Sequence, residues 1–272
     1  MTYGLSRNVE KLFDHNGHLF LLALDHAQSG VLPGLENIQN LLTKLSDAPL
    51  DGFILNIGFA SNLAEPPLLK KKLVLRTSFG GSSLADEYAS AHLNHVSPET
   101  ALGVGADAVI MMAVLGGDDY RSLQAVARDI DAFHHFSIPV VVEILARDFS
   151  KTPTFDIQYH GARIAAELGA DIVKVFYVPD FDRVVNCCSV PIILAGGPKD
   201  KDISVVAQDA IQCGARGFAF GRNIFQASDP LEVISSLRTI LSMPAAAGVI
   251  GAGTAAVVPK VAKGEEIEKR GS

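Results

Sequence analysis

The sequence contains little cysteine, and this excludes two classes of protein. Its 272 residues include three cysteines, Cys187, Cys188 and Cys213, which form no CxxC pair. Such spacing does not provide a disulfide framework or a thiolate metal site, and it is typical of a reducing compartment. We therefore expect a cytoplasmic protein.

Long apolar runs and basic stripes are missing as well. No apolar run reaches the roughly 18 residues that a membrane-spanning helix needs, and the polar stretch from Ser6 to Asn16 does not resemble a signal peptide. The net charge is −7, and lysine and arginine form no stripe that could neutralise a phosphate backbone. Neither a membrane nor a nucleic acid is expected as a partner.

Short apolar runs rich in Val, Ile, Leu and Phe recur at regular intervals, and most are separated by segments with helical periodicity or loop residues. Because the runs are nearly continuous rather than alternating, we expect parallel strands covered on both faces by helices. We predict eight such strands: His18–Ala27, Gly52–Phe59, Lys72–Phe79, Ala106–Leu115, Pro139–Leu145, Ala170–Tyr177, Pro191–Gly197 and Gly217–Arg222.

The intervals between these runs predict the covering helices. Several end in glycine directly before the next apolar run, as at Gly169 and Gly214, which is typical of a helix stop followed by a strand. Eight such units favour an α/β fold with a single (β/α)8 TIM barrel, and a doubly wound open sheet is the alternative. The predicted helices are Leu35–Leu45, Tyr120–Phe133, Phe155–Leu168, Val205–Cys213 and Pro230–Leu241.

The composition changes near the C-terminus. Residues 244–258 are rich in alanine and glycine, and residues 260–272 are mostly charged. We interpret residues 1–243 as the barrel domain and residues 244–272 as a C-terminal tail that could take part in subunit contacts.

Lys174 is the clearest candidate for chemistry. It interrupts the apolar run Ile172-Val173-Lys174-Val175-Phe176, and a lysine is almost never buried without a partner. Desolvation disfavours the ammonium form, and a neutral amine can attack a carbonyl to form a Schiff base. The alternative is a structural lysine in an ion pair, for instance with Glu143 on the adjacent strand.

Asp25 and His26 close the first apolar run, at the end of the barrel where active sites lie. A carboxylate there could hold a substrate hydroxyl or carry its proton, and the alternative for Asp25 is a cap of the following loop or helix. If the strand continues this far, His26 points the opposite way, and we interpret it as a packing histidine.

Glycines follow the seventh and eighth strands, where many barrels bind a phosphate through backbone N–H groups. Gly196 and Gly197 follow one strand, and Gly221 and Arg222 follow the next. Glycine lets the backbone approach an anion closely, so the two pairs together favour phosphate binding over simple turns. Arg222 and Lys199 could add charge-assisted contacts, although either could instead be solvated.

These motifs resemble the class I aldolases of the archaeal fructose-bisphosphate aldolase type, within the deoxyribose-phosphate and tagatose-bisphosphate aldolase superfamily. The resemblance extends from about Phe20 to about Leu241. The motifs that carry it are Leu24-Asp25-His26, Ala166-Glu-Leu-Gly-Ala-Asp-Ile-Val-Lys174, Ala195-Gly-Gly-Pro-Lys199 and Gly221-Arg-Asn-Ile-Phe-Gln226.

The resemblance implies a Schiff-base lysine at Lys174, an assisting carboxylate at Asp25 and phosphate-binding loops at Gly197 and Arg222. It also implies a phosphorylated small-molecule carbonyl substrate and a homo-oligomer, commonly a decamer. No metal ion or other cofactor is expected, because a protonated imine is itself the electron sink.

One departure from the family pattern concerns the fifth strand. Family aldolases typically end it with Tyr-Pro-Arg-Gly, where the tyrosine is an acid/base, whereas this chain has Leu145-Ala146-Arg147-Asp148. Glu143, two residues earlier on the same strand face, and Tyr177 are the candidates to replace it.

Three functions remain open at this point. The first is a Schiff-base aldolase acting on a phosphorylated ketose such as fructose 1,6-bisphosphate. The second is a Schiff-base synthase or transferase on the same scaffold, including a thiolase for a phosphorylated dione, because a missing general acid costs about 10²–10⁴-fold in rate. The third is a phosphate-binding barrel without covalent chemistry.

Overall fold

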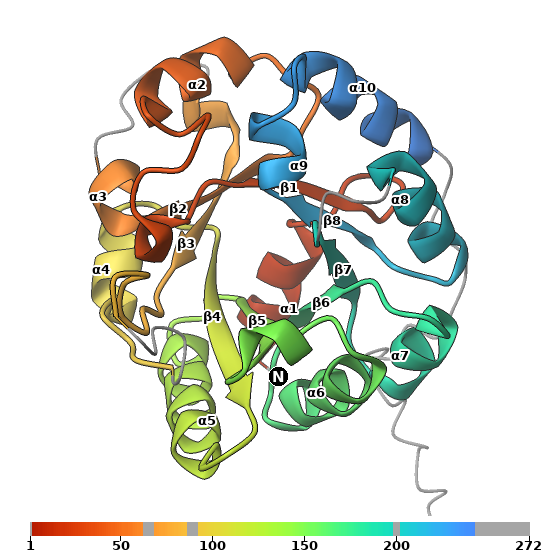
Figure 1. Ribbon diagram of the computed structural model, residues 1–272. Helices are drawn as coiled ribbons and strands as arrows, with labels where there is room; N and C mark the ends of the chain where they lie inside the picture. The colour runs from red at the N-terminus through yellow and green to blue at the C-terminus, as the bar shows by residue number, and fades with distance from the viewer. Residues whose placement is uncertain (1, 62–67, 86–91, 198–201, 243–272) are drawn as a thin grey trace, which may run out of the picture.

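Eight parallel strands close into a barrel in the computed structural model of the chain, with helices around the outside (Figure 1). The structure describes residues 2–61, 68–85, 92–197 and 202–242. The strands follow one another in chain order around the barrel, and the last pairs with the first. The predicted barrel is therefore confirmed, and the open sheet is excluded.

Seven strands lie inside the predicted runs, and the fifth extends one residue beyond its run, to Ala146. The strands are β1 (Leu19–Ala23), β2 (Gly52–Asn56), β3 (Lys72–Arg76), β4 (Ala108–Leu115), β5 (Val140–Ala146), β6 (Ile172–Phe176), β7 (Ile192–Ala195) and β8 (Gly217–Phe220). Most of their residues are buried, as expected for strands covered on both faces. The ends of the runs leave the strands and form the loops of the upper rim, so Asp25, His26 and Tyr177 lie beyond strand ends.

Helices cover the outside of the barrel and agree with the predicted helical intervals to within a few residues. The five that were predicted are α2 (Ile38–Leu45), α5 (Tyr120–His134), α6 (Phe155–Glu167), α8 (Ile203–Gln212) and α10 (Pro230–Ile240). Shorter elements, which the sequence did not indicate, are α1 (Tyr3–Glu10), α3 (Ile57–Ala60), α4 (Pro98–Gly103), α7 (Phe181–Cys187), α9 (Arg222–Phe225), and the 3-10 turns η1 (Ala27–Ser29), η2 (Leu68–Lys70) and η3 (Phe149–Lys151).

The N-terminal end of the barrel is closed by the chain that follows α1. Leu12 is buried and Phe13 packs beside it, and both contact the apolar residues that fill the inside of the barrel, such as Leu19 and Ile172. In Figure 1, α1 lies behind the ring of strands. The interior is thus packed from below, and the opposite end, where the strands finish, is left to hold a site.

No helix among the described residues is both long and apolar enough to cross a membrane. The predicted tail, residues 244–272, lies outside the described residues, so the boundary at 243 stays a prediction.

Gly217 allows β8 to approach β1 and close the barrel. Its φ is +139°, a conformation that other residues rarely adopt, and an added Cβ would collide with the carbonyl oxygen of Leu19. Leu19 is also the residue that pairs with Gly217 in the β1–β8 register. A side chain at position 217 would therefore separate the two strands.

We expect Gly217→Ala to lower the free energy of unfolding by roughly 2–4 kcal/mol, because it combines backbone strain with a collision inside the sheet. Urea denaturation followed by circular dichroism measures this. Gly103→Ala is the matched control, because an added Cβ there meets no atom within 4 Å. Equal stability of the two variants would contradict the role given to Gly217.

Candidate active site

Four charged side chains form a connected chain across the inside of the upper barrel. Asp25 follows β1, Arg76 ends β3, Glu143 lies on β5 and Lys174 lies on β6. Their side chains are only 4–10% exposed. Strand alternation directs Arg76, Glu143 and Lys174 inward, because each lies an even number of residues from an inward-facing apolar residue of its strand.

Lys174 and Glu143 are directly opposite each other in the β5–β6 register. The Nζ of Lys174 lies 2.7 Å from Oε1 of Glu143. The ion pair considered from the sequence is therefore present, at the position where a Schiff-base lysine would also need a neighbouring proton carrier.

Arg76 connects this pair to Asp25, and it was missed in the sequence. Its Nη2 donates to Oε2 of Glu143 at 2.6 Å and its Nε donates to Oδ2 of Asp25 at 2.6 Å. The third guanidinium nitrogen, Nη1, is buried without a hydrogen-bond partner among the described residues. The available signal was a charged residue at the end of an apolar run, as at Lys174.

The cations keep both carboxylates ionised. Burial alone would raise the pKa of Asp25 and of Glu143, but Arg76 and Lys174 outweigh it and hold both pKa values below their usual range. Burial alone would lower the pKa of Arg76, but its two carboxylate partners outweigh burial and raise this pKa above its ordinary value. Asp25 thus binds Arg76 inside the site and does not cap the following turn.

His26 also reaches the site, contrary to our expectation for it. Because β1 ends at Ala23, strand alternation no longer governs residue 26, and its ring lines the cavity beside Lys174. The ring packs edge-on against Phe225, with 5.2 Å between centroids. Burial lowers the pKa of His26 below its ordinary value of 6.5, so the ring is neutral at pH 7.

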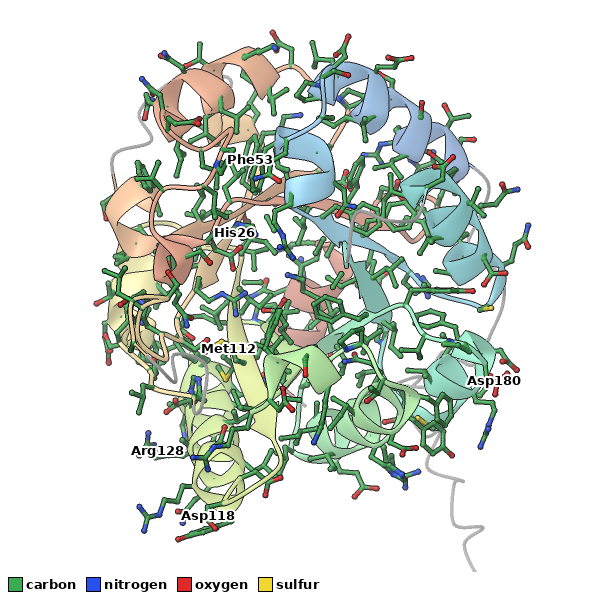
Figure 2. All side chains as sticks on the ribbon, viewed as in Figure 1. His26, Phe53, Met112, Asp118, Arg128 and Asp180 are labelled. Carbon is green, nitrogen blue, oxygen red and sulfur yellow. The ribbon has the colours of Figure 1, made fainter. Side chains whose placement is uncertain are left out.

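Two adjoining cavities open at this end of the barrel. The larger has a volume of about 210 Å³ and is lined by all four charged residues and by an apolar group comprising Leu32, Met112, Leu145, Phe149 and Phe176. The smaller, about 70 Å³, is lined by Lys174 together with the glycines after β7 and β8. In Figure 2 the labelled His26 and Met112 lie within the ring of strands, whereas Asp118, Arg128 and Asp180 lie at the periphery.

The structure brings together the four residues considered for phosphate binding. Gly196, Gly197, Gly221 and Arg222 all line the smaller cavity. Gly197 has a φ of +65°, and an added Cβ on Gly221 would lie 2.6 Å from Cε1 of His26. Gly221 directly precedes α9, and a short helix at this place frequently forms part of the phosphate site in such barrels. Lys199 lies outside the described residues.

Tyr177 is the predicted site residue that lies elsewhere. Its hydroxyl donates to Oδ2 of Asp209 on α8 at 2.6 Å, and its ring stacks on Phe181. The hydrogen bond and burial raise its pKa to about 12. Tyr177 follows inward-facing Phe176 and therefore points to the helices, away from the cavity that contains Lys174.

Leu145 occupies the position where family aldolases have their tyrosine. Its side chain lines the larger cavity and packs with Met112 and Val114 from β4. The hydroxyl of the family aldolases is therefore replaced by hydrocarbon, close to the four buried charges. Glu143, which lies two residues earlier and contacts Lys174, remains the candidate proton carrier.

The fold and the site together define a (β/α)8 barrel with a buried lysine between a carboxylate cluster and a glycine-lined recess. The chain belongs to the DeoC/LacD family of aldolases, and the model of this family matches residues 10–227. The resemblance inferred from the sequence motifs is thereby confirmed.

Two of the similar proteins illustrate relatives that are named as a synthase and as a thiolase. A 2-amino-3,7-dideoxy-D-threo-hept-6-ulosonate synthase of Archaeoglobus fulgidus is 30% identical over 241 residues, covering 88% of this chain and 91% of the relative. A 3-hydroxy-5-phosphonooxypentane-2,4-dione thiolase of Enterobacter sp. (strain 638) is 31% identical over 253 residues, covering 89% of this chain and 82% of the relative.

Among solved structures, an archaeal fructose 1,6-bisphosphate aldolase is similar with a TM-score of 0.77 and 27% identity, covering 87% of this chain and 98% of that one. A second structure is titled as a Schiff-base-forming fructose-1,6-bisphosphate aldolase, with a TM-score of 0.76 and 27% identity, covering 87% of this chain and 99% of that one. The chain thus shares its fold with Schiff-base aldolases, while the names of its relatives include other reactions.

We expect Arg76→Met to lower the free energy of unfolding at pH 7 by about 3–5 kcal/mol, because it leaves two buried carboxylates without their shared cation. In the wild type both pKa values lie below their ordinary values of 3.8 and 4.5. The ionised carboxylates therefore stabilise the folded state at a pH above their ordinary pKa values of 3.8 and 4.5. This contribution to the free energy of unfolding is lost as the pH falls below those values and the carboxylates take up protons. The difference between wild type and Arg76→Met should therefore narrow below about pH 4.

Urea denaturation between pH 3 and pH 8 measures both effects. Arg128→Met is the control, because Arg128 is 74% exposed and a surface ion pair contributes about 1 kcal/mol or less. A difference that is independent of pH would contradict the electrostatic role of Arg76.

Proposed function

We propose that this chain is a Schiff-base aldolase in which Lys174 binds the keto carbon of a phosphorylated ketose. The observation that carries the proposal is the position of Lys174. Its side chain is only 6% exposed, yet it lines both the charged cavity and the glycine-lined cavity. A substrate held by its phosphate in the smaller cavity would bring its carbonyl to the lysine.

Glu143 is proposed as the proton carrier for Schiff-base formation. The Lys174 ammonium transfers a proton to the Glu143 carboxylate at 2.7 Å, and the neutral amine adds to the keto carbon. The resulting carbinolamine takes up a proton and loses water to give a protonated imine. That cation accepts the electron pair of the C–C bond as it breaks, and the hydroxyl on the departing carbon loses its proton to a carboxylate, for which Asp25 is the second candidate.

Gly196, Gly197, Gly221 and Arg222 are proposed to bind the substrate phosphate. The glycine backbones leave room for an anion in the smaller cavity, and α9 begins at its edge. Arg222 is exposed and lines both cavities, so it can approach a phosphate without breaking the buried ion pairs.

A synthase or transferase on the same scaffold is the second candidate, and Leu145 favours it. An aldolase that cleaves a sugar bisphosphate benefits from a hydroxyl acid at this position, and here the position is apolar. The names of the Archaeoglobus and Enterobacter relatives are compatible with this candidate. Both candidates use Lys174 and the phosphate recess in the same way, so one experiment tests what they share.

We expect dihydroxyacetone phosphate and sodium borohydride to attach the reduced three-carbon phosphate irreversibly to Lys174. Peptide mass spectrometry locates the adduct. Lys174→Met should abolish the adduct and reduce any C–C bond turnover by roughly 10⁴-fold or more, because the nucleophile is lost.

Lys44→Met is the matched control for this experiment, because Lys44 is exposed on α2. This variant should form the adduct at the wild-type rate. If Lys174→Met retains turnover, the chemistry is non-covalent. If no adduct forms and no turnover is found, the barrel only binds phosphate.

We expect Leu145→Tyr to raise kcat/KM for the cleavage of fructose 1,6-bisphosphate by about 100-fold, because it provides the hydroxyl acid of family aldolases. Coupled detection of dihydroxyacetone phosphate release measures the rate. Leu145→Phe adds the same ring without the hydroxyl and should not raise the rate. Equal rates for the two variants would show that the missing hydroxyl does not limit cleavage.

A further inference from the structure

An apolar wall occupies one side of the larger cavity. It consists of Met112 on β4, Leu145 on β5 and Phe149 on η3, and Phe176 on β6 adjoins it. Met112 and Leu145 are almost completely buried, while Phe149 is 44% exposed and lines the cavity. Three apolar side chains beside four buried charges make an asymmetric site, and a substrate that is apolar at one end would match it.

The wall lies across the barrel from the glycine-lined cavity. The strands close in the order β1 to β8, so β4 and β5 are on the side opposite β8 and β1. Lys174 on β6 lies between the two sides and lines both cavities. A substrate bound to Lys174, with its phosphate among the glycines, therefore extends its other end to the wall.

No cation among the described lining residues is left to bind a second phosphate at the wall. The cations among these residues are Arg76, Lys174 and Arg222. Arg76 and Lys174 are in buried ion pairs, and Arg222 also lines the phosphate recess. Burial of a second phosphate against hydrocarbon is costly, whereas an apolar fragment gains about 0.8 kcal/mol for each buried methylene group.

We infer that the wall formed by Met112, Leu145 and Phe149 binds an uncharged, apolar-ended carbonyl fragment, so that the substrate carries its phosphate only on the fragment attached to Lys174. This inference rests on the proposed function and specifies its substrate class. The fragment that leaves, or joins, is a short aliphatic aldehyde rather than a phosphorylated one.

Condensation with dihydroxyacetone phosphate tests this specificity. The wild-type protein is supplied with acetaldehyde, propanal, butanal or glyceraldehyde 3-phosphate, and kcat/KM for the aldehyde is measured. We expect kcat/KM to rise about threefold to fourfold with each methylene group from acetaldehyde to butanal. Butanal should exceed glyceraldehyde 3-phosphate by at least about tenfold.

Phe149→Lys tests the wall itself. The side chain is partly exposed at the mouth, so the substitution adds a cation facing the bound fragment with little risk to folding. We expect the preference for butanal over glyceraldehyde 3-phosphate to fall about tenfold or more. Phe149→Leu keeps the wall apolar and should keep the preference for butanal. Circular dichroism confirms that both variants are folded.

The outcomes separate this inference from the proposed function. Borohydride trapping of dihydroxyacetone phosphate on Lys174 is carried out on the same preparation. If the adduct forms and glyceraldehyde 3-phosphate is preferred, or no aldehyde is consumed, the inference is overturned while the Schiff-base proposal stands. If no adduct forms, the Schiff-base proposal itself fails. Parallel loss of both aldehydes in Phe149→Lys also counts against the wall.

Discussion

The guanidinium of Arg76 is the interaction on which the site depends. It neutralises Asp25 and Glu143 together, and through Glu143 it sets the position of the carboxylate oxygen that meets Lys174. Two buried carboxylates without this cation would repel each other and take up protons. One side chain from β3 therefore connects β1, β5 and β6 in both geometry and charge.

Much of the architecture could be predicted, because its signals are local. Eight apolar runs and the glycines at helix ends specified the strands and their parallel arrangement. The short helix α1 could not be predicted, because it is mostly polar and Leu5 is its one buried residue. A helix this short is stabilised mainly by tertiary packing, here of Leu5, rather than by its intrinsic propensity.

The candidate site was predicted in part, and the failures have physical causes. Lys174 and Glu143 were found because a charge inside an apolar run must be compensated. Arg76 gave the same signal and was overlooked. Tyr177 lies three residues after Lys174, so strand alternation already pointed it to the opposite face, and this was overlooked. For His26, orientation depended on where β1 ends, and a strand end is set by pairing with neighbours that are distant in the sequence. Such pairing is not visible in a local pattern.

Glycines lie at both ends of the region where β8 contacts β1. Gly217 faces the carbonyl group of Leu19, and Gly221 faces the carbonyl group of Ala23 and the ring of His26. The seam that closes the barrel is thus also one edge of the phosphate recess. During evolution, the stability of the barrel and its ligand preference cannot change independently at these two glycines, because a substitution there affects both properties at once. New specificities in such a scaffold should arise mainly on the opposite rim, around β4 and β5.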